Sequence, residues 1–170
     1  MNEETNNAAA NAEQPQSTFS IQKIYVKDVS FESPGAPDSF VMEGGYKPNI
    51  GLELNTSNKH LSDSNYEVTL NLTVTAKESE EKVMFLAEVK QCGIFQIQNM
   101  EEMVQRHTLG SFCPSILFPY ARQIISDLVS NGGFPQLLLA HINFEQLFQA
   151  NEERRNAEAA GQAPSESAPH

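Results

Sequence analysis

Apolar and polar residues alternate along most of the first hundred positions, as they do in strands that bury one side. The clearest run spans residues 66–77, where every second side chain is apolar and the others are Glu, Thr, Asn or Lys. The same pattern predicts strands over residues 19–32, over residues 50–54 and from residue 83 to about residue 97. One-sided alternation favours an antiparallel sheet with one dry and one wet face.

The first predicted strand is long and carries a distinct polar side. Its apolar side is predicted to hold Phe19, Ile21, Tyr25, Val29 and Phe31, and its polar side Asp28, Ser30 and Glu32. No obvious bulge interrupts it, so its edge could pair with a second copy. Residues 33–48 are rich in Pro and Gly and predict a long crossing or functional loop, and residues 55–65 read as polar turn.

From Cys113 onward the apolar period changes from two to between three and four. Ile116, Tyr120, Ile124 and Leu128 mark an amphipathic helix that Pro114 opens and residues 131–133 (Asn-Gly-Gly) close. Pro119 predicts a kink or a late start. Asn143 is the predicted cap of a second helix, and Phe144, Leu147 and Phe148 form its apolar stripe. Strands followed by helices predict an α+β fold, a four-stranded antiparallel sheet with two C-terminal helices packed on one face.

The two ends of the chain are poor in large apolar residues. We therefore expect a disordered arm over residues 1–18, one folded domain over residues 19–148, and a helix end followed by a disordered tail over residues 149–170. Eleven Lys and Arg against 22 Asp and Glu give a net charge of -11. Such a surface argues against nucleic-acid binding. The sequence has no apolar run of membrane-spanning length and no signal-peptide pattern, so we expect a cytoplasmic protein with no direct membrane insertion.

Catalytic and metal-binding patterns are weak. Cys92 and Cys113 are too few for a disulfide scaffold and are expected to be free structural thiols. His107 and Cys113 could form a base and nucleophile, but a packed thiol before Pro114 is at least as good an interpretation. The histidines lack metal-ligand spacing and no Gly-rich phosphate loop follows a strand. We expect no enzyme activity, no cofactor and no bound metal.

Several segments together resemble the SecB family of bacterial protein-export chaperones. They are FSIQKIYVKDVSFESPGAP, YEVTLNLTVTA, FLAEVKQCGIF, CPSILFPYAR and GGFPQLLLAHINFEQLF, and they cover about residues 19–148. The chain departs from the family pattern at Tyr46, where Trp is usual, and at residues 140–141, which read Ala-His where Ala-Pro is usual.

The resemblance implies an ATP-independent holdase that keeps unfolded secretory preproteins competent for translocation and delivers them to the SecA motor. It implies a homotetramer built as a dimer of dimers. It also implies a docking surface for the zinc-binding C-terminal tail of SecA at Asp28, Glu32, Leu86 and Glu88, although a plain solvated acidic face would carry the same residues.

Client polypeptide is expected in an apolar groove, although the same side chains could simply be core. The candidate lining residues are Tyr46, Ile50, Leu52, Leu54, Tyr120, Phe144, Leu147 and Phe148. Two alternatives to an export chaperone remain open on sequence. One is a noncatalytic adaptor that binds one folded partner through its acidic sheet, and the other is a related chaperone dedicated to a toxin–antitoxin pair.

Overall fold

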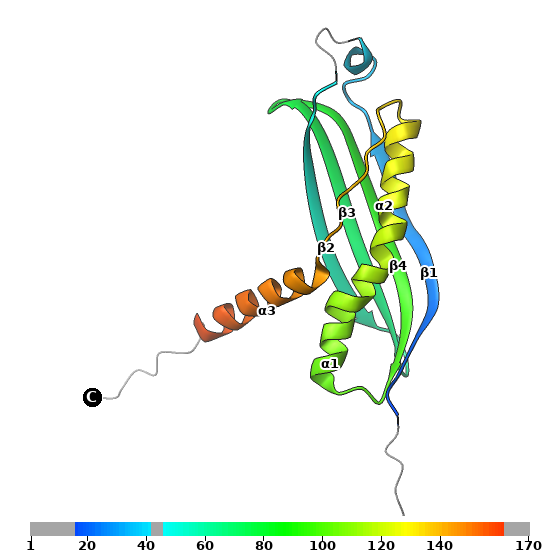
Figure 1. Ribbon diagram of the computed structural model, residues 1–170, viewed down its shortest axis with the longest axis vertical. Helices are drawn as coiled ribbons and strands as arrows, with labels where there is room; N and C mark the ends of the chain where they lie inside the picture. The colour runs from blue at the N-terminus through cyan, green and yellow to red at the C-terminus, as the bar shows by residue number, and fades with distance from the viewer. Residues whose placement is uncertain (1–15, 42–45, 162–170) are drawn as a thin grey trace, which may run out of the picture.

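The structure, a computed structural model, describes residues 16–41 and 46–161. Its centre is one antiparallel sheet in the order β1-β4-β3-β2 (Figure 1). The strands are β1 (Thr18–Glu32), β2 (Asn49–His60), β3 (Asn65–Ser79) and β4 (Lys82–Gln98). A short 3-10 turn, η1 (Asp38–Phe40), lies in the loop between β1 and β2. The predicted α+β class and the four-stranded sheet are confirmed.

The hairpin of β3 and β4 supplies most of the core. The alternation predicted for β3 is confirmed, because Tyr66 is partly buried on one of its faces and the other apolar side chains of that face are fully buried: Val68, Leu70, Leu72, Val74 and Ala76. On β4, Phe85, Val89 and Phe95 lie on the same face and are also buried. The opposite face carries Thr, Asn, Glu and Lys side chains, and we call it the outer face.

Strand β1 departs from simple alternation. Its pairing with β4 shifts register between Ile21 and Lys23 and again between Val26 and Asp28. Tyr25 therefore pairs with Cys92 and lies on the outer face, and the prediction that placed it beside Phe19 is wrong. The expectation of a strand without bulges is wrong for the same reason. An extra residue at each irregularity reverses which side chains face the core.

Strand β2 is longer than its sequence indicated. It pairs with β3 without a shift from Asn49 to His60, so the prediction of a turn over residues 55–65 is wrong for its first half. Only residues 61–64 connect the two strands. Backbone pairing to the well-formed β3 sustains the strand through side chains that seldom favour one, such as Asn55 and Asn58.

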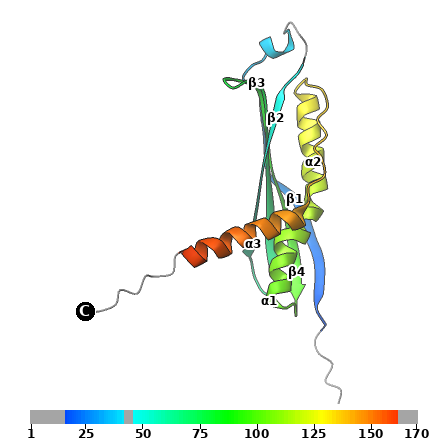
Figure 2. The same ribbon diagram turned by 60° about the vertical axis from the view of Figure 1, so that its left-hand side comes forward.

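Helix α2 (Cys113–Asn131) covers one face of the sheet and packs on β4 and β3 (Figures 1 and 2). Its predicted bounds are confirmed, and it runs through Pro119 from an early start at Cys113. Two elements that the sequence did not indicate precede it. They are a short helix, α1 (Glu102–His107), and a π-helical turn, η2 (Thr108–Phe112).

Helix α3 (Phe144–Gly161) follows a connection that runs back along the sheet beside α2 (Figure 1). The predicted cap is confirmed, because the Gln146 backbone N–H donates to Asn143 Oδ1 at 3.1 Å. The first turns of α3 rest on η2, and the rest of the helix points away from the sheet (Figure 2). The prediction that the helix gives way to a tail near residue 150 is wrong, since α3 continues to Gly161.

The expected terminal segments fall largely outside the described residues. Residues 1–15 of the predicted arm and residues 162–170 of the predicted tail are not among them. In the described ranges 16–41 and 46–161, no helix is both long enough and apolar enough to cross a membrane.

Candidate functional site

A groove of about 320 Å³ lies between β2 and the start of α3. Four of the predicted client-binding residues line it: Leu54, Phe144, Leu147 and Phe148. Phe144 is only 4% exposed and its ring packs on Phe118 at 5.7 Å between centroids. Phe144 is therefore a core residue that forms the floor of the groove, whereas Leu147 is exposed on its wall.

The position of Phe148 depends on a close approach to η2. A Cβ atom on Gly110 would lie 2.5 Å from the Phe148 ring, so only glycine leaves room for it here. On its other side the ring meets the edge of the His107 imidazole, with centroids 5.3 Å apart. The Phe148 ring thus packs against both α1 and η2, and a client in this groove would contact an aromatic ring that is held in place from two sides.

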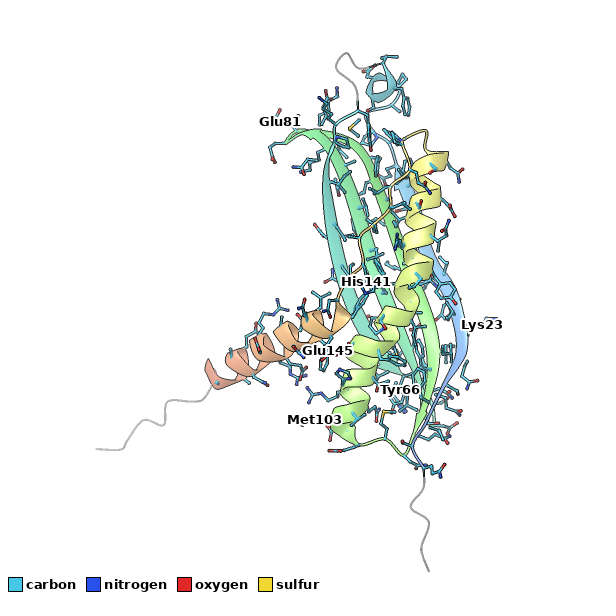
Figure 3. The ribbon with its side chains drawn as sticks, viewed as in Figure 1. Lys23, Tyr66, Glu81, Met103, His141 and Glu145 are labelled. Atoms are coloured by element: carbon cyan, nitrogen blue, oxygen red, sulfur yellow. The ribbon has the colours of Figure 1, made fainter. Side chains whose placement is uncertain are left out.

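Polar contacts hold the same end of α3 in place. The Glu145 carboxylate bonds to the His107 ring and accepts from Ser111 Oγ at 3.1 Å. The bond from His107, chiefly, lowers the pKa of Glu145 below its ordinary value. Two turns further along α3, Glu152 forms an ion pair with Arg106 of α1. Figure 3 shows Glu145 near the start of α3, above Met103 of α1.

A second, more apolar pocket of about 450 Å³ lies on the α1 side of Phe148. Met103 and Val104 line it, and Met103 is 74% exposed (Figure 3). Neither residue was predicted from the sequence. The only signal for them is a pair of adjacent apolar side chains in an otherwise polar stretch, which in sequence alone is indistinguishable from a loop.

The other predicted client-binding residues lie elsewhere. Tyr46 stacks near Phe134, with ring centroids 6.0 Å apart, and burial raises its pKa. Ile50 and Leu52 lie on the helix-facing side of β2, where Ile50 packs against the core and Leu52 is exposed. Tyr120 is half-exposed on α2 and does not line the groove. The structure therefore divides the predicted set into an α3 groove, a strip on β2, an aromatic cluster at Tyr46 and an isolated Tyr120.

The four predicted docking residues come together on the outer face. Glu32 pairs with Leu86, and Glu88 lies opposite Ser30 one step along the strands. The Glu88 carboxylate accepts bonds from Ser30 and Thr73, both at 3.3 Å. We call Asp28, Glu32, Leu86 and Glu88 the acidic patch. Asp28 is partly neutralised, because its carboxylate lies 3.6 Å from Lys90 Nζ.

The thiols are free and buried, as predicted. Burial raises the pKa of Cys113 to about 12, which leaves almost no thiolate at neutral pH. His107 bonds to Glu145 rather than to this thiol. In the part of the chain that the structure describes, no three His, Cys, Asp or Glu side chains gather as a metal site would require.

Comparison with known proteins shows the family to which the chain belongs. The sequence profile of the family described as "Preprotein translocase subunit SecB" matches residues 11–155. The chain is 46% identical to "Protein-export protein SecB" of Pseudomonas paraeruginosa over 167 residues, 98% of this chain and 99% of the relative. It is 47% identical to the protein of the same name in Stutzerimonas stutzeri over 165 residues, 96% of this chain and 98% of the relative.

A solved structure shares the fold. It is the SecB-like chaperone of Mycobacterium tuberculosis in complex with a peptide from an antitoxin, with a TM-score of 0.58 and 17% sequence identity. The match covers 73% of this chain and 90% of that one. At this identity the likeness concerns the arrangement of the sheet and helices alone.

Proposed function

Since this chain belongs to the SecB family and is a chaperone for preprotein export, we propose that it holds unfolded preproteins along the helix-covered side of its sheet, with Phe148 as an anchor. The observation that carries this proposal is that Phe148 borders two hollows: the groove between β2 and α3, where Leu54 and Leu147 lie among polar side chains, and the more apolar pocket lined by Met103 and Val104. Apolar and aromatic walls bind side chains of many sequences, because burial of apolar area demands no particular partner.

The client surface extends beyond this groove in the proposal. The strip of Ile50 and Leu52 connects the groove, along β2, with the aromatic cluster at Tyr46. A polypeptide that follows β2 from one end to the other would bury apolar side chains at each of these places. Tyr120, which lies apart on α2, is assigned to assembly instead.

The family binds preproteins and SecA, and its members are not catalysts. We propose that this chain too acts without a catalytic step and without ATP. The inert Cys113 thiol supports this, because the residue best placed by sequence to be a nucleophile is almost entirely protonated at neutral pH. Action in the cytoplasm, where preproteins are held before export, is part of the same proposal.

The acidic patch is the proposed docking site for the zinc-binding tail of SecA. Carboxylates at Glu32 and Glu88 surround the half-buried Leu86 side chain, so a basic partner gains both charge attraction and apolar burial. The patch lies on the face of the sheet opposite α2, so docking and client holding use different faces.

Neither alternative function, an adaptor for one folded partner or a chaperone dedicated to a toxin–antitoxin pair, is favoured. Relatives named protein-export proteins match nearly the whole chain at 46% to 47% identity. The chaperone bound to an antitoxin peptide shares only the fold.

The test is retention of an unfolded client by a Phe148→Ala variant. If Phe148 is an anchor, we expect the dissociation constant for a reduced, carboxymethylated protein to rise about tenfold, within the range of roughly 1 to 3 kcal/mol for a lost aromatic contact. Leu61→Ala is the matched control, since Leu61 is an exposed apolar residue in the turn after β2 and lies outside the groove. Equal constants for Phe148→Ala and the parent would remove the groove from the client surface.

A further inference from the structure

The outer face of the sheet carries its charges in two zones along the strands, which adjoin at the Asp28–Lys90 ion pair. Toward one end lie the carboxylates of the acidic patch, with Glu53 of β2 on the same face opposite Thr73. Toward the other end, three lysines rim a shallow pocket of about 350 Å³. This lysine pocket is lined by Lys27, Lys59 and Lys90 together with Glu67, Ser57, Asn58, Thr69 and Asn71.

The lysine pocket keeps an excess of positive charge after its internal pairs are counted. Lys27 Nζ bonds to both carboxylate oxygens of Glu67, at 3.0 and 3.2 Å. Lys90 lies 3.6 Å from Asp28 at the edge of the acidic patch. Lys59 takes part in no ion pair within the described residues, although its charge acts on Glu67. Three cations thus face one carboxylate inside the pocket, in a chain whose net charge is -11.

The two zones are close enough for one short segment to span both. Glu88 lies in the acidic patch, and Ile94, six residues along β4, is in register with Glu67, which in turn pairs with Lys59. Six residues of extended strand cover about 20 Å. The hydroxyl and amide side chains of Ser57, Thr69 and Asn71 add hydrogen-bonding groups beside the lysines.

We propose that the outer face recognises an extended segment of a partner protein with basic residues at one end and carboxylates about six residues away. The basic end lies over the acidic patch, and the carboxylates enter the lysine pocket. The inference rests on the proposed docking function of the acidic patch and adds a requirement for acidic residues in the partner. It also gives the partner one orientation on the sheet, since the reversed orientation sets like charges against each other.

Overall charge predicts the opposite. Added carboxylates on a ligand of a chain with a net charge of -11 should weaken its binding by general repulsion. A gain in affinity on adding carboxylates therefore has to come from a local site. Whether added carboxylates raise or lower the affinity of a peptide thus tests the lysine pocket.

The experiment titrates two blocked ten-residue peptides against the full chain at low salt. Both carry three lysines and a leucine in the first half. One has three glutamates near its other end and the second has three glutamines there. We expect the glutamate peptide to bind about threefold to tenfold more tightly, in keeping with a few exposed ion pairs. Lys59→Glu should abolish that difference without weakening the glutamine peptide. Lys47→Glu, the same charge change at an exposed lysine outside the pocket, should preserve it.

The outcomes separate the two zones. Equal or tighter binding of the glutamine peptide to the parent would overturn the lysine pocket and leave the acidic patch as a docking site. If Glu88→Lys binds both peptides as the parent does, the acidic patch is wrong, and the two-zone proposal fails with it. The proposal would also be overturned if Lys47→Glu abolished the difference in affinity between the two peptides as Lys59→Glu does, because that difference would then come from net charge alone.

Discussion

Glu67 is the most constrained carboxylate on the outer face. Its side chain is 13% exposed, and it accepts hydrogen bonds from the Tyr25 hydroxyl and from Lys27. The bond from Tyr25, first, and that from Lys27 lower the pKa of Glu67, and the same bond to Glu67 raises the pKa of Tyr25 above its usual range. Both groups thus keep, at neutral pH, the protonation states that their hydrogen bond requires.

The depressed pKa of Glu67 fixes the sign of its pH dependence. A carboxyl group with a lower pKa when folded adds stability that is fully present above its unfolded pKa, near pH 4.3, and is lost as the pH falls through the folded value. We expect Glu67→Gln to lower the free energy of unfolding by about 1 to 2 kcal/mol at pH 7. The gap from the parent should narrow as the pH falls below about 4. Urea unfolding at several pH values measures this.

Glu53→Gln is the control for that series, because Glu53 is an exposed carboxylate on the same face. It should unfold like the parent at every pH. A gap for Glu67→Gln that stays constant from pH 7 to pH 3 would show that the carboxylate charge contributes nothing.

The face of the sheet on which a side chain lies was predictable where a strand alternates without a bulge. Leu86 and Glu88 share a face because β4 alternates regularly there, and their placement follows from sequence alone. Tyr25 was misplaced because register shifts in β1 depend on how β4 pairs with it, and nothing in the residues of β1 announces them. Lys59 was missed because the polar half of β2 gives no strand signal of its own.

Among the elements, the start of α3 was predictable from the sequence and its end was not. Asn143 as its cap was predictable from local chemistry. Its continuation to Gly161 was not, because residues 151–161 carry no large apolar side chain and the helix there depends on intrinsic propensity. Ala, Glu, Gln and Arg are strong helix formers, and Arg155 pairs with Glu152 at 2.7 Å on the helix surface. The π-helical turn η2 has no sequence signature, yet it decides where α3 rests.

The contact between η2 and α3 leads to a prediction for Gly110. In Gly110→Ala the new methyl group would displace the Phe148 ring, and α3 should loosen from η2. We expect faster hydrogen exchange at the amides of residues 145–150 and a weaker hold on unfolded clients, similar to that of Phe148→Ala. Gly51→Ala is the control, since its nearest atom, the Thr75 carbonyl oxygen, is at an ordinary 3.8 Å. Unchanged exchange in Gly110→Ala would mean that Phe148 does not secure α3.

Across the whole molecule, exposed apolar side chains gather on β1, η2 and α2. On the helix-covered side of β1 these are Ile21, Val26 and Val29, and on η2 and α2 they are Phe112 and Tyr120. We propose that these side chains are covered by other copies of the chain in the homotetramer. The bulges in β1 do not argue against this, because these exposed side chains can be covered face to face as well as along the strand edge.

A pair of valines tests the assembly. Val29 on β1 is 40% exposed and Val41 in the loop is 77% exposed. We expect Val29→Lys to lower the mass of the assembly in light scattering while circular dichroism stays that of the parent, because a charge would be buried between copies. Val41→Lys should keep the parent mass. A parent mass for Val29→Lys would remove β1 from the interface, and a parent that is monomeric at micromolar concentration would refute the tetramer. Ile124 and Leu128 make poorer probes, since both are half-buried within their own chain.

Native mass measurement shows whether this chain holds unfolded polypeptide without ATP. The full chain is measured alone, with a reduced and carboxymethylated client, and with the same client in its folded, disulfide-bonded form. We expect an assembly of four chains that gains the mass of the unfolded client but not that of the folded one, with no nucleotide present. If the mass of the assembly is the same with the unfolded client as without it, the chain is not a holdase.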